Sequence, residues 1–222
     1  LPRRHRRDLG VVRDQGDGSV ETLLALARAS FAQGNLLWRR ANAEGALKSY
    51  QSGLEILKPA SSASGASLQT KLVEMQLTAG AGVMQRQLYQ YATARQQLTH
   101  AMELGKKIGA VELTYLPATE VYLAAGRELS WQAYQDESKP KEAVQSANDQ
   151  IALANRVLQV RPDHRPVLRA KAAATALLSR IEYDNLRVAA ALKRDLEQHA
   201  VLERLVALDK SNVGIWINLG NL

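Results

Sequence analysis

Histidines are the first side chains to test for chemistry, because imidazole binds metals and transfers protons near neutral pH. The chain has four: His5, His100, His164 and His199. None has a second histidine or a cysteine at helical ligand spacing. His199 and Glu203 are four residues apart and could meet on one helix, but two ligands do not make a metal site. We therefore predict neither a metal nor any other cofactor.

Other short motifs point away from catalysis. Ser138 and Lys141 have the nucleophile spacing of some hydrolases, but they lie at a proline-containing break and lack partner motifs. Gly80-Ala81-Gly82 is an incomplete dinucleotide loop inside a helical pattern. The segment 14–18 is similar to a calcium loop without its closing acidic residue. No carboxylate pair stands out for acid–base work, so we predict that the chain is not an enzyme.

Composition indicates an all-α protein. Of 222 residues, 46% are hydrophobic and only 5% aromatic, and Ala, Leu, Gln and Arg favour helix over strand. The absence of cysteine excludes disulfides and cysteine-ligated zinc, and it suits a soluble protein of the cytoplasm or the periplasm equally. No apolar run approaches the roughly 20 residues that cross a bilayer.

Much of the net charge of +7 comes from one segment at the N-terminus. Four arginines, at positions 3, 4, 6 and 7, lie in a basic and polar tail over residues 1–18. The tail is expected to be solvated, or to flank a membrane segment that this sequence does not include. Nucleic acid is not an expected partner, because the rest of the chain is close to charge balance.

Apolar residues recur every three or four positions, which predicts helices. Pro117 and Pro140 suit first helical turns, whereas Pro59 is expected to end a helix at Leu57. Short links predict antiparallel neighbours within a single domain over 19–222. The expected helices cover 20–38, 43–57, 66–88, 91–108, 117–135, 140–160, 166–183 and 186–208, and a last one begins at 213.

Two pairs of small residues recur in the sequence with the same spacing. Gly34 and Gly82 are 48 residues apart, as are Ala46 and Ala94. Small residues let paired helices approach, and a large neighbour such as Tyr50 fills the space that remains. These small residues therefore predict repeated helical hairpins.

The C-terminal residues Trp216, Leu219 and Gly220 have the Trp-x2-Leu-Gly spacing of the tetratricopeptide repeat (TPR), and the chain resembles that family. Residues 113–162 offer no glycine at the expected place, and residues 166–208 keep only the end of the pattern. A generic helical array therefore remains an alternative. The resemblance implies packing roles for Gly34, Ala46, Tyr50, Gly82, Ala94, Ala101, Trp216, Leu219 and Gly220.

The resemblance also implies a right-handed α-solenoid, in which the first helix of each hairpin lines a concave face that holds a peptide or a partner protein. Phe31 stands where the family's carboxylate-binding site has a lysine, so that ligand is not expected. Trp38 could bind a partner or seal a turn between helices. The other predicted partner-binding residues are polar or basic and suit a polar or acidic ligand; they are Arg28, Asn35, Arg39, Gln76 and Arg86.

A second hypothesis is a self-associating sensory or structural region of a larger bacterial signalling protein, such as a kinase or a regulator. Bacterial proteins that resemble this chain often carry such arrays beside those domains. Here the last repeat is expected to be truncated, and the segment 213–222 would present an apolar patch that could form a homodimer.

Overall fold

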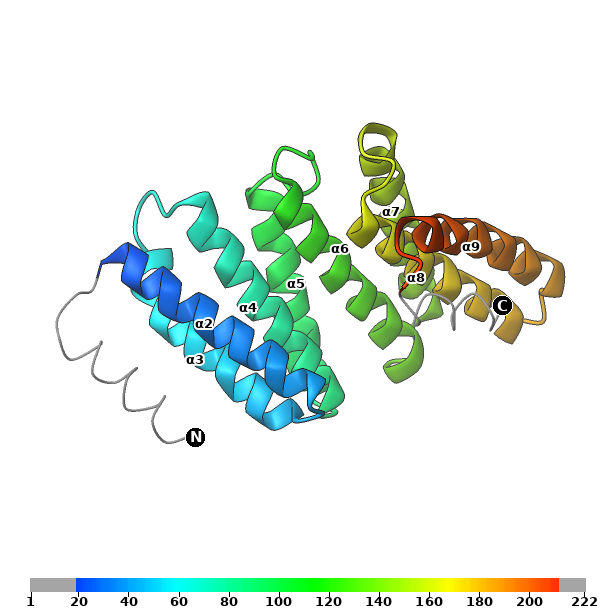
Figure 1. Cartoon of the computed structure of the whole chain (residues 1–222). Helices are drawn as coiled ribbons and strands as arrows, with labels where there is room; N and C mark the ends of the chain where they lie inside the picture. The colour runs from blue at the N-terminus through cyan, green and yellow to red at the C-terminus, as the bar shows by residue number, and fades with distance from the viewer. Residues whose placement is uncertain (1–18, 212–222) are drawn as a thin grey trace. The chain divides into compact units, whose positions relative to one another are not determined.

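A computed structural model describes residues 19–211, and within that range every regular element is a helix. The prediction of an all-α fold is confirmed for these residues, whereas the tail 1–18 and the predicted last helix from 213 lie outside them. Figure 1 shows the succession of the helices. They are α2 (Val20–Arg39), α3 (Ala43–Ser61), α4 (Leu68–Gln87), α5 (Tyr91–Lys107), α6 (Leu116–Trp131), η1 (Gln132–Asp136), α7 (Pro140–Val160), α8 (Arg165–Asp184) and α9 (Val188–Leu208).

Local chemistry explains where these helices begin. The first backbone N–H groups of a helix have no partner within it, so side-chain oxygens cap them. The Oγ of Ser19 accepts from the Thr22 N–H at 3.2 Å, and the Oδ1 of Asn42 accepts from the Gly45 N–H at 2.8 Å. Three later helices, α6, α7 and α8, instead place a proline in the first turn, where the missing N–H costs nothing.

The expected end of the second helix was wrong by one turn. Helix α3 continues through Pro59 to Ser61. A proline in the last turn removes only one backbone hydrogen bond, and Ala60 beyond it is buried. The N–H of Ser62 still donates to the carbonyl of Lys58 at 3.0 Å, so the final turn closes after the proline.

Four tight turns recur through the chain. Each contains a residue with positive φ: Ala41 (56°), Tyr89 (60°), Ser138 (52°) and Leu186 (58°). Their spacings are 48, 49 and 48 residues. Each turn joins a first helix (α2, α4, the α6–η1 pair or α8) to a second helix (α3, α5, α7 or α9). The described chain is therefore built from four helical hairpins of nearly equal length.

Buried small residues follow the same register. In the second helices they are Ala46, Ala94, Ala143 and Ala191, again 48, 49 and 48 apart and all at most 3% exposed. In the first helices the corresponding buried positions are Gly34, Gly82, Ser130 and Ser179. Serine thus occupies the small-residue position in the two hairpins where the sequence offered no glycine, and the repeat extends across the whole described range.

The π-turn η1 accommodates the one extra residue of the third hairpin. The small-residue spacing lengthens from 48 to 49 residues after Ser130, and the turn spacing lengthens to 49 residues before Ser138. The extra residue therefore lies between Ser130 and Ser138. In the other turns an N–H donates five residues back, as from Asn42 to Leu37, whereas Lys139 donates six residues back to Ala133. A single inserted residue in a helix commonly produces such a π-turn.

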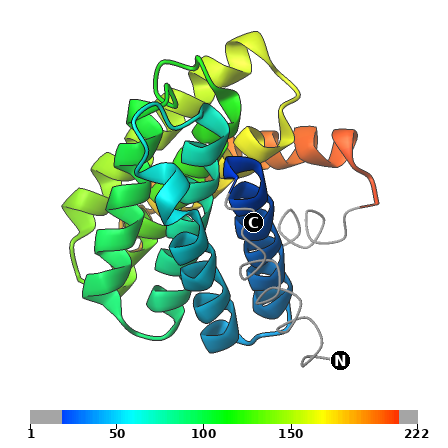
Figure 2. The same cartoon turned by 90° about the vertical axis from the view of Figure 1, so that its left-hand side faces the viewer.

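The contacts between residues divide the chain into two compact units, Leu1–Leu104 and Gly105–Leu222. In the first unit, α2 packs against both α3 and α4, and α3 also packs against α4. The three helices lie side by side in both cartoon views (Figures 1 and 2). Their core surrounds Tyr50 and contains Leu57, Val73, Leu77 and Met84, each at most 2% exposed.

The second unit repeats this arrangement. Helix α6 contacts α7 and α8, α7 contacts α8, and α8 contacts α9. One core cluster lies around Leu177 and Ile181, and another lies around Leu168 and Leu205. In both units, therefore, the first helices of successive hairpins contact each other. Over residues 19–211, no helix has the length and apolar character that crossing a membrane requires.

Candidate functional site

The predicted packing residues of the first unit are all buried. Tyr50 is 1% exposed, and Ala46, Ala94 and Ala101 are completely covered. The ring of Tyr50 lies against the backbone of Gly34, where an added Cβ would come within 2.6 Å of its Cδ1 atom. A Cβ added to Gly82 would likewise come within 2.8 Å of the Cγ atom of Leu98. The predicted packing residues Trp216, Leu219 and Gly220 lie outside the described part of the chain.

Tyr50 also uses its hydroxyl inside the unit. The hydroxyl donates to the Oδ1 of Asn35 at 2.8 Å, and burial raises the pKa of the phenol to about 12. Asn35 was predicted to face a ligand. It is half-buried, and its amide oxygen supports the core instead. Its Nδ2 group is the part left to contact a partner.

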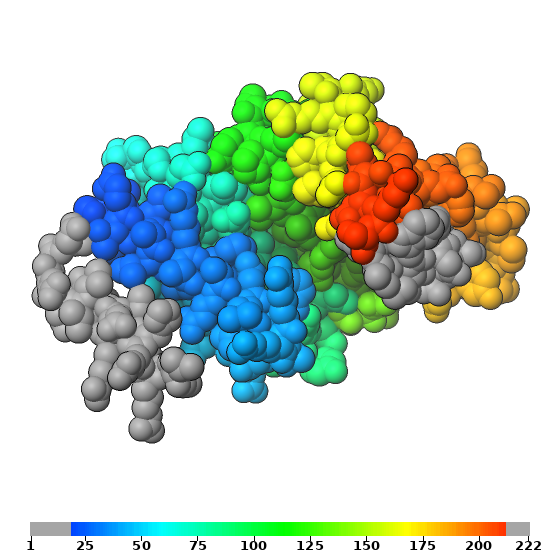
Figure 3. Space-filling view, viewed as in Figure 1, coloured from blue at the N-terminus to red at the C-terminus, as the bar shows by residue number. Residues whose placement is uncertain are grey.

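The other predicted binding residues lie on α2 and α4. Arg28 and Arg39 are exposed, while Gln76 and Arg86 are half-buried. The Nη2 atom of Arg28 donates to the Oε1 of Gln69 at 2.5 Å, which joins α2 to α4 across their outer surfaces. The helices α2 and α3 lie open at the surface (Figure 3), and only Ala27, Ser30 and Gly34 of α2 are buried.

Trp38 is the most conspicuous of these residues, because 41% of its surface is exposed. Its neighbour Leu37 packs on the core, so Leu37 covers the end of the hairpin and Trp38 faces solvent. Leu36, at 49% exposure, and the exposed Arg39 lie beside it. Exposed Trp next to Arg is a combination enriched at the centres of protein interfaces.

The second unit has a cleft of about 630 Å³ that the sequence did not reveal. Its lining residues are Trp131, Tyr134 and Gln135 at the end of α6 and in η1, and Arg180 and Asp184 in the last turns of α8. By the 48- and 49-residue register, Trp131 and Arg180 both correspond to Asn35, and Asp184 corresponds to Arg39. The cleft therefore lies at the repeat positions that were predicted to bind a partner in the first unit.

Hydrogen bonds fix the polar side of the cleft. The hydroxyl of Tyr134 and the Nε of Arg180 both donate to the Oδ2 of Asp184, the second at 3.0 Å. These bonds hold the pKa of the Asp184 carboxyl below its usual value, with the bond from Tyr134 the largest cause. Burial, followed by the bond to Asp184, raises the pKa of Tyr134. At neutral pH the Arg180–Asp184 pair is fully ionised and its charges cancel.

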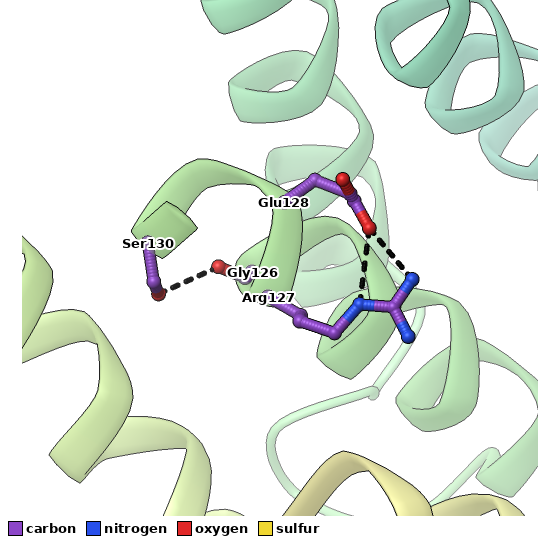
Figure 4. A network of polar contacts seen from close by, with 4 residues as sticks. All are labelled: Gly126, Arg127, Glu128 and Ser130. Atoms are coloured by element: carbon purple, nitrogen blue, oxygen red, sulfur yellow. Dashed lines mark hydrogen bonds and ion pairs between the residues drawn. The ribbon is translucent and has the colours of Figure 1, made fainter. Parts of the chain in front are cut away.

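A buried polar network surrounds the end of α6. The hydroxyl of Ser130 donates to the carbonyl of Gly126 at 2.8 Å (Figure 4) and also contacts the Ser146 hydroxyl at 2.8 Å. Gln150, from α7, donates to Ser130 at 2.7 Å. These contacts tie α6 to α7 directly before the π-turn. They position the end of α6 and form no accessible site, because Ser130 and Gln150 are at most 3% exposed.

Several other charged and titratable groups form ion pairs with a neighbour. Figure 4 shows Arg127 reaching its neighbour Glu128, whose Oε1 accepts from Nη2 at 2.6 Å. His164 lies 3.2 Å from Glu120 and His199 lies 3.7 Å from Glu203. No group of three potential metal ligands occurs among residues 19–211.

Two surfaces thus stand at equivalent repeat positions, one on α2 and α4 and one in the cleft between η1 and α8. The resemblance to tetratricopeptide repeats singled out the first. The second was missed, since Trp131 and Arg180 are 49 residues apart and no short motif links them. Comparison with known proteins adds no family to this description: no family model matches the chain, and neither the curated proteins nor the solved structures gave a match.

Proposed function

We propose that this protein is a TPR-like scaffold that binds a peptide or a segment of a partner protein along the first helices of its hairpins. The observation that carries the proposal is the contact between successive first helices in each unit, α2 with α4 and α6 with α8. Such contacts align the outer faces of these helices, and stacked hairpins with aligned first helices form the concave binding face of an α-solenoid.

The character of the first-helix surface suits a polar or acidic ligand. Arg28, Arg39 and Arg86 all contribute cationic groups there. The hydrogen bond from Arg28 to the neutral amide of Gln69 orients the guanidinium and leaves its charge intact. Exposed Trp38 adds an apolar anchor. Basic groups around an aromatic residue attract an acidic segment and give it a point of specific contact.

Charge reversal tests this surface. In the triple variant Arg28→Glu/Arg39→Glu/Arg86→Glu, we expect affinity for acidic peptides or for an acidic partner to fall by more than about tenfold, or about 1.4 kcal/mol. The matched control is Lys48→Glu/Lys58→Glu/Arg156→Glu, which changes the net charge equally at exposed positions on second helices. Fluorescence anisotropy with labelled peptides measures both variants, and circular dichroism checks that both fold. An equal loss in the two variants would show non-specific attraction and would contradict the proposal.

A specific observation also favours self-association within a larger bacterial signalling protein. Five large apolar side chains at the α8–α9 turn and along α9 are more than half exposed, which is unusual for a surface that has no partner. The predicted patch at 213–222 lies outside the described residues, whereas these side chains lie within them. They are Tyr183 (61%), Leu186 (87%), Val188 (62%), Leu192 (58%) and Leu196 (64%).

Light scattering coupled to size exclusion distinguishes this second function. A self-associating chain should have about twice its 24.4 kDa mass, and the double variant Leu192→Lys/Leu196→Lys should return it to a monomer. Charged groups at the centre of an apolar interface cannot be desolvated without a large cost. A wild-type chain that is monomeric at high micromolar concentration rules out self-association and leaves the scaffold proposal.

A further inference from the structure

The cleft between η1 and α8 contains the residue types that dominate protein interfaces. Trp131, Tyr134 and Arg180 line it together with Gln135 and Asp184, and Trp, Tyr and Arg are the most enriched residues at binding hot spots. At about 630 Å³, the cleft is of the size that holds a drug-sized ligand or a few peptide residues. It is therefore large enough to hold part of an extended segment.

Charge within the cleft is balanced. The carboxylate of Asp184 accepts from Arg180 and from Tyr134, so the guanidinium has an anionic partner already. The nearby Glu182 and Arg187 also pair, at 3.3 Å. Unlike the first-helix surface of the first unit, this cleft has no excess charge with which to select an acidic or a basic ligand.

Arg180 can still donate hydrogen bonds to a ligand, although its charge is balanced by Asp184. The side chain of Arg180 is 60% exposed, and its bond to Asp184 uses only the Nε atom. A guanidinium has two further nitrogens with N–H groups. Because its Nε is held by Asp184, Arg180 loses less side-chain entropy than a free arginine when it donates to carbonyl oxygens of a ligand.

The opposite wall is aromatic. Trp131 and Tyr134 are half-buried and pack against the apolar cluster around Leu177 and Ile181. Their remaining surface lines the cleft. Because the core holds both rings in place, they offer a rigid apolar surface. Such a surface suits a compact, rigid side chain such as the proline ring.

We propose that this cleft binds a neutral, proline-containing segment of the partner in the polyproline II conformation. That conformation leaves backbone carbonyls without internal hydrogen bonds, so they can accept from Arg180 while a proline ring packs on Trp131. Aromatic-lined grooves commonly recognise such segments because the peptide is already ordered before it binds. The inference rests on the proposed scaffold function and specifies the ligand of the second unit.

The indole N–H signals of the tryptophans provide a direct test by nuclear magnetic resonance, assigned with single Trp→Phe variants. The full chain is titrated with a neutral, proline-rich peptide of about ten residues, with the same peptide carrying alanine in place of proline, and with an acidic peptide. Variants Arg180→Gln and Trp131→Leu are compared with Arg156→Gln, an exposed arginine on the second helix α7.

We expect the proline peptide to shift the Trp131 signal saturably and to leave the Trp38 signal unchanged. Arg180→Gln and Trp131→Leu should each weaken binding about tenfold, and Arg156→Gln should not; for Trp131→Leu, which lacks the Trp131 signal, binding is followed by the signals of the peptide. The inference is overturned if the Trp131 signal stays constant, if the alanine peptide binds equally well, or if the acidic peptide binds the cleft more tightly. Each of these outcomes leaves the charge-reversal test of the first-helix surface intact, so the two failures are distinguishable.

Discussion

Replacing Tyr50 with alanine should lower the free energy of unfolding by about 3–5 kcal/mol. Tyr50 is the largest side chain in the core of the first unit and is 1% exposed. The centroid of its ring lies 5.8 Å from the centroid of the Phe31 ring, and the ring packs against Gly34 and Gly80. Alanine would leave a cavity that Gly34 and Gly80 cannot fill, because glycines have no side chain to move into it. Urea denaturation followed by circular dichroism measures the loss.

A conservative variant separates the ring from the hydroxyl. Tyr50→Phe keeps the ring and removes the 2.8 Å bond to Asn35, which should cost only about 1 kcal/mol. If the phenylalanine variant lost as much stability as the alanine variant, the hydrogen bond rather than ring packing would dominate, and the cavity argument would fail.

The close contact with Gly34 gives a second check on the same argument. Gly34→Ala should destabilise the wild-type protein by about 1–3 kcal/mol, because the new Cβ would overlap the Tyr50 ring. In a Tyr50→Ala background the ring is absent, and the same change should stabilise the helix by about 0.5–1 kcal/mol. The change of sign would identify the Gly34–Tyr50 contact as the cause.

Replacing Leu205 with alanine should cost about 2–5 kcal/mol. Leu205 is 1% exposed and packs in the cluster that contains Leu168, Val201 and Leu202, which joins α8 to α9. Loss of its side chain leaves a cavity in this cluster. Thermal and urea denaturation should both show the decrease.

The matched control lies on the same helix. Leu196 is 64% exposed, so Leu196→Ala should change the free energy of unfolding by less than about 0.5 kcal/mol. Similar losses at the two positions would mean that a partner covers Leu196 in solution. That result would disagree with the single-chain structure and would favour self-association through α9.

The positions of the helices could be predicted from the sequence alone, because their signals are local. Side-chain caps at Ser19 and Asn42, prolines in first turns and apolar spacing all act within a few residues of where they stand. The 48-residue shift between Gly34 and Gly82 was also visible. The same reasoning failed at Pro59, since the sequence does not show that the residue beyond it is buried.

Tertiary structure alone decided how the middle of the chain continues the repeat. Ser130 and Ser179 serve where glycine stood in the first two hairpins, because a serine hydroxyl is small enough for close packing and bonds to backbone or to Gln150. The extra residue between Ser130 and Ser138 became a π-turn. Apolar periodicity cannot distinguish such a turn from an α-helix over five residues.

The cleft of the second unit also depended on tertiary structure. Trp131 and Arg180 are far apart in sequence, and only the contact between α6 and α8 brings their helices together. In the first unit, the sequence singled out Asn35 for binding, but the structure shows its amide oxygen bonded to Tyr50. Residue type and spacing determined the helices and their register. Which polar groups remain available to a partner was decided by packing, since only neighbours distant in the chain can cover a side chain or bond to it.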